Sequence, residues 1–87
     1  MIFGLSAALC EQISLKDGAV ANSNFHDYRV VRLSESPEVF VSIIENDEAP
    51  GGVGEPGVPP VAPALCNAIY AATGERIRRL PVASQLI

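Results

Sequence analysis

The sequence predicts an α+β fold in which a small sheet packs with two helices, and three observations support this class. Apolar residues recur at near-helical spacing over residues 1–11, which predicts a first helix. A second apolar helical run covers Val61–Thr73, with prolines only in its first turn and Gly74 as its stop. Between the two, alternating apolar residues flank Asp17-Gly18, a strong signal for a β-hairpin.

Two further segments complete the predicted sheet. Glu38–Glu45 (EVFVSIIE) is rich in Val, Ile and Phe, and its apolar residues fall on both faces, which predicts an internal strand. Arg76–Leu80 is expected to be a short last strand or an extended tail, halted by Pro81. The sheet would then combine the hairpin, one central strand and a short C-terminal strand. Asn22–Arg32 is predicted to be an ordered connection, and Val61–Thr73 to be a buried helix.

The length and composition limit what the chain can be. Its 87 residues allow one domain at most, covering residues 1–87. Yet 48% of the residues are hydrophobic, a high apolar load for so small a volume. We therefore expect part of the apolar surface to meet a partner or further chain, and this surface also favours self-association. No stretch reaches the ~18 apolar residues that a membrane span needs, so none is predicted.

The charged and sulfur-containing residues exclude several classes of partner. The net charge of −4 argues against nucleic acid, because phosphate binding needs clustered basic residues. The one basic cluster, Arg76, Arg78 and Arg79, is expected to be a solvated face or to supply one ion pair. Cys10 and Cys66 lie 56 residues apart with no CxxC, so we predict no metal site and expect buried free thiols, with a disulfide as the alternative.

The segment from Asn46 to Pro60 is unusual in holding four of the seven glycines and four of the seven prolines. Its residues 52–57 match GxGxxG literally, but the prolines remove backbone donors that a pyrophosphate would need. The strand expected after the next helix also carries no acidic residue to hold a ribose. A nicotinamide dinucleotide site is therefore not predicted, and a Walker A loop is excluded because no GK[ST] follows.

Glu55 is the most informative residue of this loop. It lies between Gly54 and Pro56, so its carboxylate would be presented on a stiff segment, as a positioned general base requires. The alternative from spacing alone is a surface glutamate in a turn. His26, a lone histidine beside Phe25 and Tyr28, is expected to pack or face solvent. The two aromatic residues are expected in the core or in a subunit contact.

Specific motifs run from Ala49 to Pro81, APGGVGEPGVPPVAPALCNAIYAATGERIRRLP. A GxGE loop at Gly52–Glu55 is followed by a helix with A-x-x-N-A-I at Ala64–Ile69. This pattern resembles the C-terminal end of the molybdenum-binding subunit in the xanthine dehydrogenase and aldehyde oxidase superfamily, in its isoquinoline 1-oxidoreductase branch. Further matching motifs lie upstream: GLSAA at residues 4–8, the Asp-Gly hairpin, NFHDY at residues 24–28 and PEV at residues 37–39.

The resemblance implies a function. Such enzymes hydroxylate N-heterocycles or oxidise aldehydes with water, and Glu55 would be the general base on a molybdenum-bound hydroxyl. Gly52, Val53 and Gly54 would lie against the molybdenum–pterin cofactor, expected in its cytosine dinucleotide form. The partners implied are the remainder of the molybdenum-binding subunit and a small iron–sulfur subunit.

The remaining cofactor-holding loops of that subunit have no counterpart in 87 residues. We therefore expect the isolated chain to be inactive and to bind the cofactor only within the complete enzyme. The alternative hypothesis is a non-catalytic binding or assembly module, or a remnant, that keeps the fold of the same C-terminal lobe.

Overall fold

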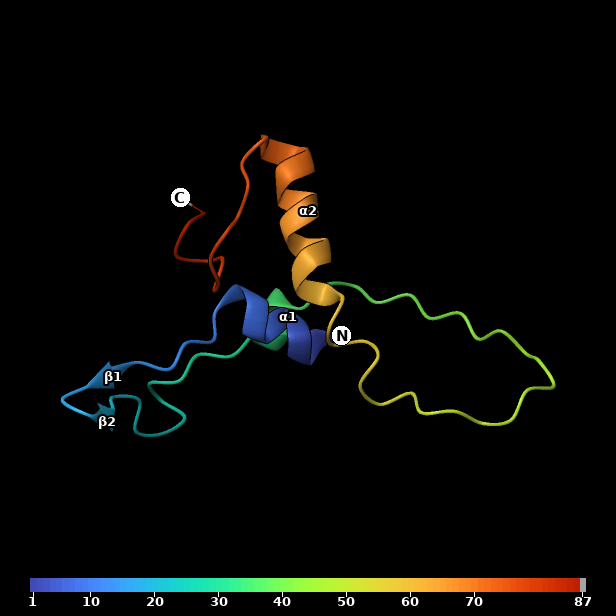
Figure 1. Cartoon of the computed structure of the whole chain (residues 1–87), viewed down its shortest axis with the longest axis horizontal. Helices are drawn as coiled ribbons and strands as arrows, with labels where there is room; N and C mark the ends of the chain where they lie inside the picture. The colour runs from blue at the N-terminus through green and yellow to red at the C-terminus, as the bar shows by residue number, and fades with distance from the viewer. Residues whose placement is uncertain (87) are drawn as a thin grey trace.

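Helix α1 (Ile2–Leu9) lies at the centre of the structure, a computed structural model that describes residues 1–86 (Figure 1). Its buried residues are the small ones, Gly4, Ser6 and Ala8, whereas Phe3 is largely exposed. Small side chains allow other segments to approach the helix backbone closely. The predicted first helix is confirmed, and its small-residue surface is the one that other segments cover.

The predicted hairpin is also confirmed. Strand β1 (Leu15–Lys16) pairs antiparallel with β2 (Ala19–Val20), and Leu15 lies opposite Val20. Asp17 and Gly18 join them with φ of 52° and 80°. A two-residue loop with both φ values positive matches the right-handed twist of the strands, which is why Asp-Gly is favoured there.

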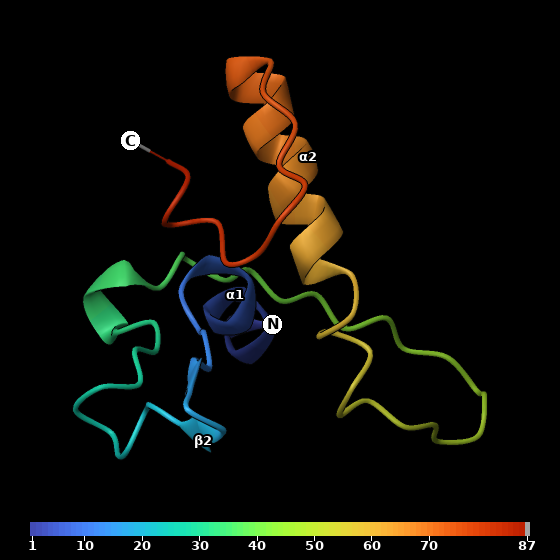
Figure 2. The ribbon, with the colours of Figure 1, turned by 60° about the vertical axis from the view of Figure 1, so that its left-hand side comes forward.

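Helix α2 (Val61–Thr73) has the predicted bounds. Gly74 ends it with φ 77°, and its N–H donates to the Tyr70 carbonyl at 2.8 Å. The expectation that this helix is buried is wrong, because none of its residues is buried. Only its first turns approach α1, and the rest extends away from the centre (Figure 2).

Two predicted strands do not form within residues 1–86. Glu38–Glu45 is extended but unpaired, with Phe40 and Ile43 more than four-fifths exposed. Arg76–Leu80 takes the alternative form, an irregular tail. The sheet therefore has two strands, β1 and β2, and the α+β class holds with a smaller sheet than expected. A strand needs a neighbour for its backbone N–H and C=O groups, and within residues 1–86 these two segments pair with none.

The small core forms where the C-terminal tail returns to α1. Val82 is fully buried beside Ala8, and its N–H donates to the Ala8 carbonyl at 2.9 Å. The next donor, Ala83 N–H, reaches the Leu9 carbonyl at 2.8 Å. The last carbonyls of a helix have no partner within the helix, and here the tail supplies the donors.

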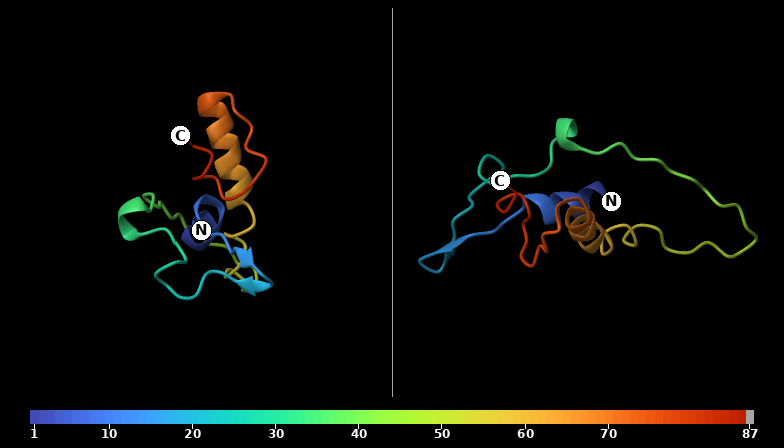
Figure 3. Two further views of the ribbon diagram at one scale, coloured as in Figure 1. Left: turned by 90° about the vertical axis from the view of Figure 1, so that its left-hand side faces the viewer. Right: turned by 90° about the horizontal axis from the view of Figure 1, so that it is seen from above.

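The remainder of the chain is spread out. Residues 38–56 form a long arm that projects from the helices (Figures 1 and 3). The radius of gyration is 16.3 Å, whereas a compact domain of this length has about 12 Å. The accessible surface is 7391 Å². A folded monomer of 9.2 kDa would expose about 4,900 Å², so roughly 2,500 Å² is in excess.

Candidate functional site

Glu55 begins a tight turn at the end of the arm. The Glu55 carbonyl accepts the Val58 N–H at 2.9 Å, and the Val58 carbonyl accepts the Val61 N–H at 3.3 Å at the entry to α2. Pro56 occupies the second position of the first turn, where its fixed φ suits the geometry. Glu55 is therefore tied to the start of α2 by two successive turns.

The same turn is held against α1. A Cβ placed on Gly4 would lie 3.0 Å from the Val58 carbonyl oxygen and 3.4 Å from the Val61 Cβ. A Cβ on Gly57 would lie 3.4 Å from the Met1 nitrogen. Glycine at position 4 thus permits backbone-to-backbone contact between α1 and the turn. The turn after Glu55 is therefore supported by α1, although the arm before it projects outward.

The three residues before Glu55 leave their backbone open. Gly52, Val53 and Gly54 are exposed, and a Cβ on either glycine would meet nothing within 4 Å. Among residues 1–86, no hydrogen bond uses the N–H groups of these three residues. Free backbone donors on glycine-rich chain are suited to the polar edge of a large cofactor. The cofactor contact expected of these residues stays a prediction.

The Glu55 side chain is exposed and makes no hydrogen bond or ion pair within residues 1–86. Beside its turn runs a groove of about 430 Å³ between α1 and α2. The groove is lined almost wholly by apolar residues: Met1, Leu5, Pro37, Gly57, Pro60, Val61, Ala64, Leu65 and Ala68. The Glu55 carboxylate is thus unpaired among the described residues, and the turn that carries it borders the apolar groove.

A second cluster occupies the loop after the hairpin, at residues 22–28. The Asp27 carboxylate accepts the N–H groups of Ser23 and Asn24 and the Ser23 hydroxyl at 2.8–3.0 Å. The bonds from Asn24 and Ser23 lower the pKa of Asp27 below its ordinary value. The His26 Nε2 lies 3.8 Å from Asp27 and is largely exposed, in agreement with the solvent-facing expectation. The predicted ordered connection is confirmed by this network.

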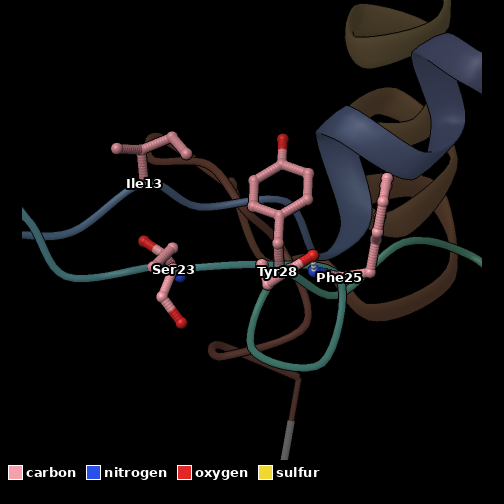
Figure 4. Close-up of a pocket in the computed structure, with 6 residues that line it drawn as sticks. Ile13, Ser23, Phe25 and Tyr28 are labelled. Carbon is pink, nitrogen blue, oxygen red and sulfur yellow. Dashed lines mark hydrogen bonds between the residues drawn. The ribbon is translucent and has the colours of Figure 1, made fainter.

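The aromatic residues of the same loop border a shallow pocket (Figure 4). The Tyr28 hydroxyl donates to Glu11 Oε2 at 2.7 Å, which raises the pKa of Tyr28. Phe25 is 95% exposed, so it belongs to no core within this chain, and the subunit-contact alternative stays a prediction. In Figure 4 the Phe25 and Tyr28 side chains project in the same direction.

Both thiols are free, as expected, but they are half-buried rather than buried. Within the part of the chain that the structure describes, no group of three or more His, Cys, Asp or Glu side chains could hold a metal ion. Over residues 1–86 no helix is long and apolar enough to cross a membrane. Arg76, Arg78 and Arg79 are exposed, in agreement with the expected solvated face. Arg76 also stacks 3.5 Å from the centre of the Tyr70 ring and donates to Asn67 Oδ1.

One structural residue was not anticipated from the sequence. The hydroxyl of Ser6, which is buried on α1, accepts the N–H of Val31 at 2.9 Å. This bond joins the central helix to the chain that leaves the second cluster. The run Gly-x-Ser-x-Ala within an apolar helix could have indicated this contact, because small residues on one face let another backbone approach.

Comparisons with known proteins give a consistent set of relatives. The chain is 42% identical over 82 residues to isoquinoline 1-oxidoreductase subunit beta of Brevundimonas diminuta, covering 94% of this chain and 10% of that protein. It is 39% identical over 89 residues to a putative xanthine dehydrogenase molybdenum-binding subunit of Escherichia coli, covering 94% and 12%. A third relative, a membrane-bound aldehyde dehydrogenase of Gluconacetobacter polyoxogenes whose name specifies pyrroloquinoline quinone, is 37% identical over 81 residues, covering 93% and 10%.

No family model matches the sequence, and no solved structure gives a significant match. The chain spans about a tenth of the length of the curated relatives it matches. The predicted resemblance is confirmed: nearly the whole chain is similar to one segment of molybdenum-binding and related oxidoreductase subunits.

Proposed function

We propose that this chain forms part of a molybdenum hydroxylase that hydroxylates N-heterocycles or oxidises aldehydes with oxygen from water, and that Glu55 is its general base. The observation that carries the proposal is the similarity of nearly the whole chain to molybdenum-binding subunits. The exposed, unpaired Glu55 carboxylate in a GxGE loop supports it. The 87 residues would belong to one domain, the C-terminal part of the cofactor-binding domain.

When bound, the molybdenum–pterin cofactor, in its cytosine dinucleotide form, supplies the two-electron oxidation of the substrate carbon. The N–H groups of Gly52, Val53 and Gly54 would donate to its polar edge. Glu55 would accept a proton from the water-derived oxygen that attacks the substrate. Because its turn is braced against Gly4 of α1, the backbone that carries the Glu55 carboxylate would be held in a fixed position relative to that helix.

The rest of the site must come from outside these residues. The free donors at Gly52–Gly54 would provide one wall of a cofactor site, and the apolar groove that begins at Gly57 and Pro60 would be covered by further chain. The proposed partners are therefore the remainder of the molybdenum-binding subunit and a small iron–sulfur subunit that removes the electrons. The competing hypothesis is a binding or assembly module that keeps this segment's fold and has no role for Glu55 in proton transfer.

A chimera tests the proposal. The matching segment of the Brevundimonas diminuta subunit is replaced by this chain, the enzyme is purified with its other subunit, and molybdenum content and isoquinoline-dependent dye reduction are measured. Glu55→Gln should retain the metal and lose activity by about 10²–10⁴-fold, the usual contribution of a general base. Glu48→Gln, an exposed acidic residue of the same arm, is the matched control and should leave activity unchanged.

Two results would contradict the proposal. If Glu55→Gln turned over isoquinoline as fast as the unchanged chimera, the assembly-module hypothesis would replace it. If the active chimera held a quinone and no molybdenum, the cofactor assignment would be wrong, and the cofactor named for the Gluconacetobacter relative would take its place.

A further inference from the structure

Residues 38–45 have the composition of an internal strand and the conformation of an unpaired one. Within residues 1–86, no backbone N–H or C=O group of this segment takes part in a hydrogen bond. Its large apolar side chains are exposed on both faces: Val39, Val41 and Ile43 alternate with Phe40 and Ile44. Four of these five side chains are more than three-quarters exposed.

Both ends of the segment are defined. Pro37, immediately before it, lines the groove between α1 and α2 and so anchors the segment to the helices. After it, Asn46 Oδ1 accepts the Glu48 N–H at 2.9 Å, a local turn that halts an extended chain. Eight residues between these points span about 27 Å as a strand, the length of an ordinary strand in a sheet.

We infer that residues 38–45 insert as a strand between two strands of a β-sheet contributed by polypeptide outside these 87 residues. Free hydrogen-bonding groups along both edges can pair with a strand on each side, and the apolar side chains on both faces would be stabilised by cover above and below. The excess surface of roughly 2,500 Å² is the size of a large, permanent interface rather than a transient one.

The charges favour a strand of different sequence over a second copy of this chain as the neighbour. The segment begins at Glu38 and ends at Glu45. An antiparallel pair of copies in register would place Glu38 of one opposite Glu45 of the other, and a parallel pair would place each glutamate opposite itself. Like charges directly opposite are destabilising. The receiving strands should instead carry lysine or arginine near these two ends and apolar residues between them.

Amide hydrogen exchange tests the inference, with the isolated 87-residue chain and the chimera described above compared. In the isolated chain, the amides of residues 38–45 should exchange as in an unstructured peptide. In the chimera they should slow by about 100-fold or more, because each is then paired in a sheet. Val41→Pro removes one donor and should abolish the protection of its neighbours, whereas Ala49→Pro, in the arm but outside the strand, should not.

The choice of scaffold rests on the proposed function, but the two can fail separately. A chimera that turns over isoquinoline while residues 38–45 exchange freely would overturn the inserted strand and leave the function intact. If residues 38–45 were protected in the chimera while Glu55→Gln kept full activity, the proposed role of Glu55 would be overturned and the inserted strand would stand. An isolated chain that sediments as a dimer with residues 38–45 protected would overturn the inference in favour of self-pairing.

Discussion

Gly4 and Val58 meet backbone to backbone: a methyl group at Gly4 would stand 3.0 Å from the Val58 carbonyl oxygen and 3.3 Å from its Cα. Both Val58 atoms belong to the backbone, which cannot move aside as the end of a flexible side chain can. This contact joins the central helix to the turn that carries Glu55. The position of the proposed base therefore depends on the absence of a side chain at Gly4, which is far from Glu55 in the sequence.

Gly4→Ala should therefore destabilise the chain by about 1 kcal/mol. Overpacking lowers the free energy of unfolding by about 1–3 kcal/mol, and the higher helix propensity of alanine offsets about 1 kcal/mol of this loss. The matched control is Gly51→Ala, where a Cβ meets nothing within 4 Å and φ is not positive, and it should be neutral or slightly stabilising. Urea unfolding followed by the helical circular dichroism signal measures both. A more stable Gly4→Ala variant would show that the turn is not held by this contact.

Ser6→Ala should remove the acceptor of the Val31 N–H. Leaving that donor without a partner beside a buried site costs about 1–3 kcal/mol of unfolding free energy. Ser42→Ala changes the same atoms at an exposed position with no hydrogen bond and should lie within about 0.5 kcal/mol of the parent chain. Equal effects in the two variants, in the same urea titration, would mean that the Ser6 hydroxyl does not stabilise the fold.

The loop at residues 22–28 should loosen in acid. Bonds from Asn24 and Ser23 hold the pKa of Asp27 below its ordinary 3.8. A lowered folded-state pKa means that the stabilisation is present above the ordinary value and is lost as pH falls through the folded one. The amide resonances of Ser23 and Asn24 should therefore move only at the acid end of a titration from about pH 6 to about pH 2. Asp27→Asn should abolish this movement, and its persistence in that variant would assign it to another group.

The isolated chain should contain no stoichiometric molybdenum and should not reduce dyes with quinoline or aldehydes. The donors at Gly52–Gly54 are exposed, and within residues 1–86 a Cβ at either glycine would meet nothing within 4 Å, so water would reach a cofactor bound there. Metal analysis of the purified chain and a dye-coupled assay check this. Stoichiometric metal in the chain alone would mean that these residues suffice for binding.

The elements that depend on nearby residues were predictable. Asp17-Gly18 specifies its hairpin because both residues tolerate positive φ, and Gly74 ends α2 for the same reason. The bounds Val61–Thr73 follow from local propensity, with prolines at the start and glycine at the end. The strand predicted at Glu38–Glu45 and the burial predicted for α2 were wrong, because each needs a neighbour that these residues do not supply. The roles of Glu55 and of Gly52–Gly54 stay predictions.

The sequence by itself determined two helices, one hairpin, the GxGE loop and a resemblance that nearly the whole chain shares with its relatives. All of these depend on the conformational preferences of a few adjacent residues or on their order along the chain. Only the tertiary structure decided that Gly4 supports the turn of Glu55, that Ser6 holds Val31, and that Val82 returns to Ala8. Such contacts join residues far apart in sequence, and no local preference specifies which distant backbone will approach.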